Sequence, residues 1–389
     1  MRILLAFDKF KDALTARDTC RIAEKAIAEI QAEWTIETAP LADGGDGFCD
    51  TLTGVAGGEF FSAPVTGPLG ETTEATFGIV SKAQLQSSTK ALLQLTDSTE
   101  RIAIIEMAEC SGIALTPIRN RSPWIATSAG LGDAIAAAAG KGAHAAVIGL
   151  GGSATHDLAL GALQRLGVRF LDRAGLEIEH PPCPNLWPRI ASIDLSNSNL
   201  PAGFELRLAC DVENPLLGAN GAAAIFGPQK GLTEDRFEEL EDSTQRLAGL
   251  LCQAASASPE TMASPGTGAA GGAAFGLKTG LGATIVSGYE LVKTWIGLED
   301  KFDRADCIVT GEGRFDASSL QGKGPGALAL ETIAASKRLY VFAGSLGPLE
   351  NDLFEAHSLV AISPEDLPLE QALPATQANL VRAVQATFA

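Results

Sequence analysis

VIGLGGSATHD, residues 147–157, is a short apolar run that leads into a glycine-rich turn. Apolar residues then recur at helical spacing from Leu158 to Leu166, and a glycine follows them. The backbone N–H groups of such a turn, together with the dipole of the helix that it opens, favour an anion. The stretch therefore predicts a strand, an anion-binding turn and a helix that is capped by Ser153 or Thr155.

The same theme of apolar run, Gly or Asp turn and helical pattern recurs along the chain. The apolar runs lie at residues 2–7, 35–39, 145–150, 307–310, 339–342 and 359–363. A T-x-x-D pattern at Thr15 and Asp18 predicts the start of the first helix. Strands that alternate with helices indicate a doubly wound parallel sheet with helices on both faces. Ligands of such sheets bind beyond the carboxyl ends of the strands, and most Gly, Asp, Lys and Arg clusters of this chain lie there.

The intervening segments favour a second domain, as a length of 389 residues also does. Residues 59–110 and 168–232 alternate strand-like runs with turn residues, which indicates a mixed sheet built from two excursions out of the first domain. Residues 83–99 and 253–266 are polar or rich in Ala, Ser and Pro, and we expect surface loops there.

Composition and charge exclude several classes of protein. The chain has 46% hydrophobic and 20% charged residues, as soluble globular proteins do, and its net charge is −18. Such an acidic chain lacks the positive surface that binds nucleic acid or an anionic membrane. The seven cysteines show no CxxC pair and no zinc spacing, which predicts buried thiols in a reducing compartment. No apolar run is typical of a signal peptide or a membrane helix, so we expect a cytoplasmic protein.

The glycine-rich turn allows three interpretations. Gly149, Gly151 and Gly152 allow the backbone to approach a phosphate closely. The same letters fit the GxGxxA dinucleotide pattern, with Asp172 about 20 residues on, which would favour an NAD-linked hydroxyacid dehydrogenase. The glycines can also serve only the packing of a helix on a strand. The chain contains neither a Walker A pattern nor a GxSxG elbow.

Two further turns carry acidic residues. LADGGDG, residues 41–47, places Asp43 and Asp46 around two glycines. Acids in this setting hold Mg²⁺ or accept a hydroxyl proton, although Asp-Gly turns also occur in ordinary loops. FDKFKDAL, residues 7–14, adds Asp8 and Lys11 after the first predicted strand.

TGEGRFDASSLQGKGP, residues 310–325, groups four charges among glycines. Glu312 and Asp316 are candidate metal or base carboxylates, and Arg314 and Lys323 are candidate contacts for an anion. A solvated surface loop rarely gathers charges in this way, so a functional loop is favoured.

Two glycine-bounded segments complete the set. PGTGAAGG, residues 265–272, is a second phosphate-loop candidate through Gly268 and Gly271. FGPQKG, residues 226–231, places Lys230 between glycines.

Together, and in this order, the segments resemble the bacterial-type glycerate kinase family, whose members lack a Walker loop. The matching segments are FDKFKDALTA, LADGGDG, VTGPLG, EMAECSG, IGLGGSATHD, ACDVENPL, FGPQKG, PGTGAAGG and TGEGRFDASSLQGKGP. They are spread over essentially the whole chain. The resemblance implies an enzyme that phosphorylates D-glycerate with ATP and Mg²⁺, giving 2-phosphoglycerate and ADP, and that is a monomer or a homodimer.

The resemblance also implies an α/β fold with two domains. A flavodoxin-like parallel-sheet domain would comprise residues 1–56, 124–167 and 287–389. A mixed-sheet α/β domain would comprise residues 57–123 and 168–286. The active site would lie in the cleft between them.

The roles expected in such an enzyme follow from the matched segments. The catalytic set is Asp8, Lys11, Asp43, Arg314 and Lys323, with Asp43 or Asp8 as the base. The nucleotide-binding set is Gly149, Gly151, Gly152, Ser153, Thr155, Gly268 and Gly271. The metal-binding set is Asp46, Glu312 and Asp316, with Asp43 as a further candidate.

Three motifs depart from the family pattern. Lys9 stands where DSFK has Ser. His156, Leu158 and Ala159 stand where GGSATNDGG has Asn and two glycines, and Ser318 and Ser319 stand where DxQT has Gln and Thr. These departures would suit a non-catalytic sugar-acid-binding protein that retains the fold. That alternative and the dehydrogenase are distinguished from a kinase by ADP release and by absorbance at 340 nm without ATP.

Overall fold

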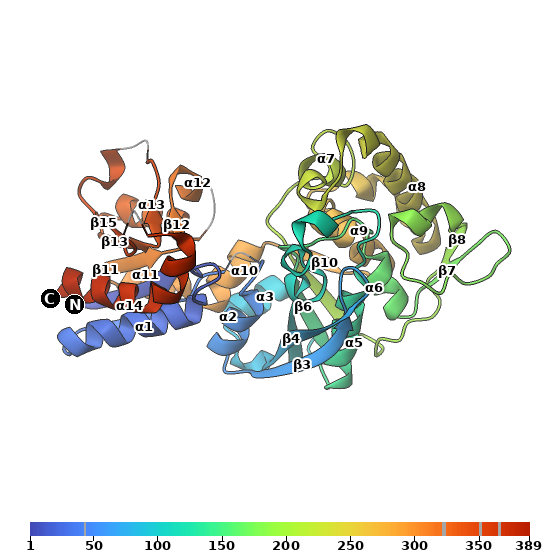
Figure 1. Ribbon diagram of the computed structural model, residues 1–389. Coiled ribbons are helices and arrows are strands. Elements are labelled where there is room, and N and C mark those ends of the chain that lie inside the picture. The colour runs from blue at the N-terminus through green and yellow to red at the C-terminus, as the bar shows by residue number, and fades with distance from the viewer. Residues whose placement is uncertain (43, 321–323, 350–351, 365–366) are drawn as a thin grey trace. The chain divides into compact units, whose positions relative to one another are not determined.

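The computed structural model describes residues 1–42, 44–320, 324–349, 352–364 and 367–389. The chain divides into two units, each built from helices and strands (Figure 1). The first unit comprises Met1–Asp43, Asp50–Val55 and Val292–Ala389, and the second comprises Gly44–Cys49 and Ala56–Leu291.

The first unit contains a five-stranded parallel sheet in the order β15-β13-β11-β1-β2. Its strands are β1 (Arg2–Phe7), β2 (Thr35–Thr38), β11 (Cys307–Gly311), β13 (Arg338–Ala343) and β15 (Ser358–Ala361). Counted along the unit, this order is 2-1-3-4-5, which is the order of flavodoxin-like sheets. The expected α/β class with a doubly wound parallel sheet is confirmed.

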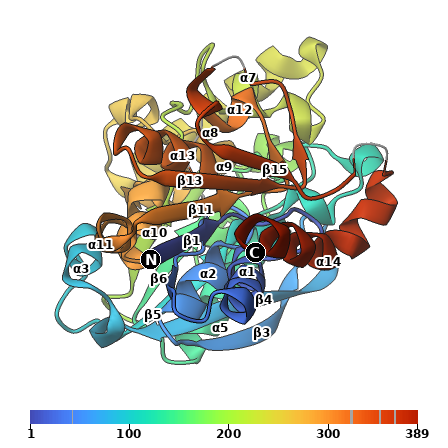
Figure 2. The ribbon, with the colours of Figure 1, turned by 90° about the vertical axis from the view of Figure 1, so that its left-hand side faces the viewer.

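Helices cover both faces of this sheet (Figure 2). On one face, α1 (Ala16–Ile30) and α14 (Leu369–Phe388) share a core with β1 and β11. On the other face, α13 (Pro325–Ala334) packs on β13. The Thr15 hydroxyl accepts the N–H of Asp18 at 3.1 Å, so the predicted cap of α1 is confirmed.

The second unit contains a six-stranded mixed sheet in the order β10-β9-β6-β5-β4-β3. Its strands are β3 (Glu59–Thr66), β4 (Thr72–Ser81), β5 (Arg101–Glu106), β6 (Ala145–Gly149), β9 (Glu205–Ala209) and β10 (Thr284–Val286). β3, β4 and β5 pair antiparallel, and β5, β6, β9 and β10 pair parallel, as expected for a mixed sheet. Its core also includes α5 (Ala129–Gly140), α6 (Leu160–Arg165), α8 (Phe237–Ala255) and α9 (Ala269–Leu281).

The division differs from the expected domains in the segments 44–49, 124–167 and 287–291, which lie in the second unit and not in the flavodoxin-like one. In the longest of these segments, β6 pairs with β5 on one side and with β9 on the other, which places this strand in the second unit. All five residues of β6 are buried. An apolar parallel strand of this kind suits the centre of either sheet, so its sequence does not specify its neighbours.

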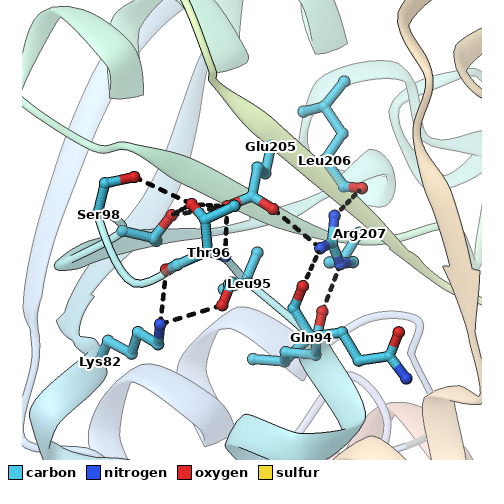
Figure 3. Close-up of polar contacts among 10 residues, drawn as sticks. Lys82, Gln94, Leu95, Thr96, Ser98, Glu205, Leu206 and Arg207 are labelled. Atoms are coloured by element: carbon cyan, nitrogen blue, oxygen red, sulfur yellow. Dashed lines mark hydrogen bonds and ion pairs between the residues drawn. The ribbon is translucent and has the colours of Figure 1, made fainter.

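Residues 83–99, expected to be a loop, contain the helix α3 (Ser87–Leu93). The Arg207 side chain on β9 binds the C-terminal end of this helix. Its Nε donates to the carbonyl of Leu93, and its Nη2 donates to the carbonyl of Gln94 at 2.8 Å (Figure 3). Glu205 pairs with Arg207 at 3.1 Å. This long-range partner in β9 satisfies two carbonyls at the end of the helix, and the local sequence gives no sign of it.

Glu205 is held as a carboxylate by the same segment (Figure 3). Its Oε2 accepts the N–H and hydroxyl of Thr96, both at 3.0 Å, and the hydroxyl of Thr99 at 2.7 Å. Burial alone would raise the pKa of Glu205, but the hydrogen bonds from Thr99 and Thr96 outweigh it and lower the pKa.

Across the described parts of the chain, no helix is both long enough and apolar enough to span a membrane.

Candidate functional site

In the first unit, several of the expected site residues follow the carboxyl ends of β1 and β11. Asp8 comes directly after β1, and its backbone N–H donates to the carbonyl of Gly311 at 3.0 Å. Glu312 comes directly after β11, and its carbonyl accepts the N–H of Gly344 at 3.1 Å. The parallel pairing of β1 with β11 thus brings these two acids to the same edge of the sheet.

Glu312 is in an acidic environment. Burial raises its pKa, a hydrogen bond with the Ser319 side chain lowers it, and the charges of Asp8 and Asp316 raise it further. Glu312 therefore lies in the electrostatic field of Asp8 and Asp316, and these three residues are called the acidic cluster below. Carboxylate oxygens are the donors that Mg²⁺ prefers.

Arg314 and Asp316 form an ion pair beside this cluster. Arg314 Nε donates to Asp316 Oδ2 at 2.8 Å, and the Arg314 side chain is 66% exposed. Asp316 Oδ1 accepts the hydroxyl and the N–H of Ser318, at 2.6 and 2.9 Å. These bonds with Ser318, followed by that with Arg314, lower the pKa of Asp316 to about 2. Ser318, which departs from the family pattern, thus orients an expected metal ligand.

The other three expected catalytic residues are Lys11, Asp43 and Lys323, and of these the structure describes only Lys11. Lys11 is exposed, and a Cβ on Gly313 would lie 3.4 Å from its backbone nitrogen, so the loops after β1 and β11 are in contact. Asp43 and Lys323 lie outside the described residues.

In the second unit, the turn that follows Asp43 is tied to β5 by Glu106. Glu106 ends β5 and is 3% exposed. Its Oε2 accepts the N–H of Gly47 at 3.2 Å, and its Oε1 accepts the N–H of Cys49 at 2.5 Å. Burial, then the charges of Glu109 and Asp46, raise the pKa of Glu106 to about 8 against the hydrogen bonds that lower it. Asp46 thus lies in the field of two other acids.

Glu106 is not among the site residues predicted from the sequence. Its signal was present, because RIAIIE is an apolar strand that ends in one acid, at the strand end where ligands of parallel sheets bind. What the sequence could not show is that this carboxylate is buried and holds a turn that lies some sixty residues earlier in the chain.

The glycine-rich turn after β6 packs on that same turn. A Cβ on Gly149 would meet the carbonyl of Gly44, and one on Gly151 would meet the Cα of Gly45. The N–H of Gly151 donates to Gly44 at 3.1 Å, and the N–H of Ala154 donates to Ser111 at 2.9 Å. Glycine is thus required for packing, and these two N–H groups are already used by the backbone.

The helix after the turn begins later than expected. Leu158 and Ala159 have φ of 55° and 54°, so α6 starts at Leu160. Its first turn is bonded by Asp157, whose carboxylate accepts the N–H groups of Ala159 and Gly161, at 3.2 and 3.3 Å. Neither Ser153 nor Thr155 caps this helix. Two consecutive non-glycine residues with positive φ are unusual, and only the tertiary packing imposes them.

Asp157 is itself fully buried. Its Oδ2 accepts the N–H and the hydroxyl of Ser128, both at 2.7 Å. Burial raises its pKa, and the bonds with Ser128 lower it.

Lys230 inserts beside the turn. It is 2% exposed, and its Nζ donates to Ser153 Oγ at 2.8 Å and to the carbonyl of Thr155 at 2.7 Å. Burial lowers the pKa of Lys230 to about 7, although the charge of Asp157 raises it. The two expected phosphate contacts Ser153 and Thr155 therefore share one buried amine.

The second glycine-rich segment packs against the first. Gly271 has a φ of 66°, and a Cβ at this position would meet the Thr155 carbonyl. The Gly271 carbonyl accepts the N–H of Leu158 at 3.3 Å, and the N–H of Gly268 donates to Asn214 at 2.9 Å. Close backbone contact accounts for the glycine at position 271.

The acid that the dinucleotide interpretation needs is engaged elsewhere. Asp172 Oδ1 accepts the N–H groups of Ala174 and Leu176, at 2.8 and 3.0 Å, within its own turn. The structure thus brings together Asp8, Glu312 and Asp316 in the first unit, and the Lys230 cluster in the second. Among the residues that the structure describes, no three His, Cys, Asp or Glu side chains have the arrangement of a metal site.

Comparisons with known proteins agree across the whole chain. Residues 3–389 match the Glycerate kinase family. The chain is 35% identical to a glycerate kinase of Bacillus subtilis (strain 168) over 376 residues, which cover 96% of this chain and 93% of the relative. It is 36% identical to a glycerate 2-kinase of Escherichia coli (strain K12) over 347 residues, which cover 89% and 86%.

A solved structure shares the fold as well. The crystal structure of a candidate glycerate kinase 2 from Salmonella typhimurium LT2 superposes with a TM-score of 0.79 and 32% identity, covering all of this chain and 97% of that one. A family match of this extent, together with relatives above 30% identity, identifies the protein as an enzyme. The chain belongs to the glycerate kinase family.

Proposed function

We propose that the protein transfers the terminal phosphoryl group of ATP to D-glycerate, with Mg²⁺, and releases ADP and 2-phosphoglycerate. The family supports the glycerate kinase activity, and the name of the Escherichia coli relative supports the 2-position. The observation that carries the proposal is the cluster of Asp8, Glu312 and Asp316 at the carboxyl edge of a flavodoxin-like sheet.

The proposed metal ligands are carboxylate oxygens, the donor type that Mg²⁺ prefers. Besides burial, the charges of Asp8 and Asp316 raise the pKa of Glu312, and a cation would relieve that repulsion. Glu312 and Asp316, with Asp46 from the second unit, are the residues that we propose as ligands. When bound, Mg²⁺ would neutralise charge on the phosphate oxygens of ATP.

The remaining roles follow from charge and position. Asp8 or Asp43 accepts the proton of the glycerate hydroxyl as the new O–P bond forms. Arg314, oriented by its ion pair with Asp316, neutralises phosphate or carboxylate oxygens together with Lys11 and Lys323.

Nucleotide contacts are proposed at the two glycine-rich segments. The proposed residues are Gly149, Gly151, Gly152, Ser153, Thr155, Gly268 and Gly271.

An ADP-release assay tests the activity. We expect turnover with D-glycerate and ATP that disappears when Mg²⁺ is chelated, and no change of NADH absorbance when ATP is replaced by NAD⁺. Asp8→Asn should lower kcat by about 10²–10⁴ with the fold retained. A wild-type protein that binds D-glycerate but releases no ADP would instead be a sugar-acid-binding protein.

A further inference from the structure

The contact between Lys230 and Ser153 constrains the direction of one hydroxyl group. An ammonium group has three donors and no acceptor, so Ser153 Oγ must be the acceptor of the 2.8 Å bond. The Ser153 hydroxyl hydrogen is then free to point elsewhere, because Ser153 Oγ has no second partner among the residues that the structure describes. Ser153 is 7% exposed, so this hydrogen can reach a group at the surface of the turn.

The bond also strengthens Ser153 as a donor. A hydroxyl whose oxygen accepts a charge-assisted bond becomes polarised, and hydrogen bonds in such a chain reinforce one another. The second bond, from Lys230 to the Thr155 carbonyl at 2.7 Å, fixes the amine so that it cannot follow a rotating serine.

Buried polar groups near Lys230 and Ser153 also have unused hydrogen-bonding capacity. The Thr244 hydroxyl donates to the carbonyl of Leu240 at 2.7 Å, so it accepts from His156 Nε2 at 3.0 Å. His156 Nδ1 is then an acceptor, and within the described residues neither it nor Thr155 Oγ1 has a hydrogen-bond partner, although both are buried. Buried polar atoms are rarely left unpaired outside functional sites.

We propose that Lys230 is a positioning residue that directs the Ser153 hydroxyl outward, so that it donates a hydrogen bond to an anionic oxygen of a bound substrate. That oxygen belongs either to a phosphate of ATP or to the carboxylate of glycerate, and the two sources are separated by the experiment. The inference rests on the proposed function for the identity of these two ligands.

The test uses Lys230→Met, Ser153→Ala and the double variant. Methionine keeps the length of the lysine stem but removes the amine, and alanine removes the hydroxyl that it directs. Isothermal titration with ATP and, separately, with D-glycerate measures the two affinities. We expect each single variant to weaken binding of one of the two ligands by about 10-fold or more, as for a hydrogen bond to a charged group.

The double variant tests whether the two residues act together. Because Lys230 acts through Ser153, the double variant should bind no more weakly than the weaker single variant. If the losses multiply, or if neither single variant changes either affinity by more than about 2-fold, the proposal is overturned.

Thr244→Val is the matched control, since it breaks the bond with His156 in the same buried cluster without touching Lys230. It should lower the melting temperature and leave both affinities within about 2-fold of the wild type, because it removes structure but not the donor. If Thr244→Val weakens binding as much as Lys230→Met does, Lys230 is only structural. If Lys230→Met does not fold, the comparison of the ligand affinities of Ser153→Ala and Thr244→Val decides the test alone.

A pH series adds a readout that packing alone would not change. Burial lowers the pKa of Lys230 to about 7, and the titratable groups around it are Asp157, which raises that pKa, and His156, whose own pKa is lowered to about 3 by burial. Above pH 7 the neutral amine can accept the serine hydrogen, so wild-type affinity should fall as the pH rises through about 7. The affinity of Ser153→Ala should not follow this change. Equal pH profiles would contradict the proposal.

The two proposals fail in different ways. A wild type that releases no ADP from ATP and D-glycerate refutes the proposed function, whereas the titrations still decide whether Lys230 and Ser153 hold an anion. An active wild type with unchanged affinities in both single variants refutes only the role of Lys230.

Discussion

Replacing Glu106 with glutamine should change the pH dependence of stability in the second unit. Glu106 is 3% exposed, and its two oxygens accept the N–H groups of Gly47 and Cys49. Glutamine keeps the shape but offers one acceptor oxygen, so one N–H group loses its partner. A lost partner for a buried N–H costs about 1–3 kcal/mol, and this cost does not vary with pH.

The titration of Glu106 gives the pH-dependent part. Mainly through burial, the pKa of Glu106 rises from 4.5 to about 8 in the folded chain. A carboxyl whose folded pKa is above its unfolded pKa contributes stability that is complete below the unfolded value and is lost as the pH rises through the folded value. At about 1.4 kcal/mol per pH unit, the wild type should lose about 4 kcal/mol relative to Glu106→Gln between pH 5 and pH 9. The wild type is then the more stable protein at pH 5, and the variant at pH 9.

Urea denaturation without Mg²⁺ or nucleotide measures this difference. The tryptophans are Trp34 and Trp295 in the first unit and Trp124 and Trp187 in the second. A Trp34→Phe, Trp295→Phe background therefore leaves fluorescence that reports on the second unit.

Glu205→Gln is the control, because hydrogen bonds from Thr99 and Thr96 lower the pKa of Glu205 in spite of burial. Its contribution is present above the unfolded pKa and is lost only as the pH falls, so its difference from the wild type should be flat from pH 5 to pH 9. A flat profile for Glu106→Gln as well would refute the assignment of a buried, titrating carboxyl.

Three further substitutions have expected outcomes. Arg207→Met should destabilise the second unit by about 3–5 kcal/mol in urea, because Arg207 is 7% exposed and its removal leaves the partly buried Glu205 without its cation, whereas Arg169→Met, at an exposed pair, should change the stability much less. Gly271→Ala should lower the melting temperature more than Gly282→Ala; both have positive φ, but only position 271 has backbone in the way of a Cβ. Asp316→Asn should weaken Mg²⁺ binding to the protein, as followed by titration calorimetry, by about 10-fold or more; unchanged binding would remove Asp316 from the metal ligands.

β1 and β11 of the first sheet could be predicted because each is an apolar run that leads into a turn with Gly or Asp. The acids that follow these two strands lie at one edge because the strands are parallel. The sheet to which β6 belongs could not be predicted, since AAVIG carries no information about its neighbours.

Only some residues of the candidate site could be predicted from the sequence, for a related reason. Asp8 and Glu312 follow strand ends and are visible as a pattern. Lys230 and Glu106 act from the interior, and the burial of a charged side chain depends on residues far away in the chain. The positive φ angles of Leu158 and Ala159 could not be predicted either, because residues other than glycine rarely adopt them.

Proton-coupled ³¹P NMR of the product formed from ATP, D-glycerate and Mg²⁺ tests the proposed reaction most directly. Phosphate on the secondary hydroxyl couples to one proton, so a new doublet is expected beside the signals of ADP. A triplet would place the phosphate on the terminal hydroxyl and contradict the proposed product. If ATP and D-glycerate stay unchanged, the protein is not the kinase proposed here.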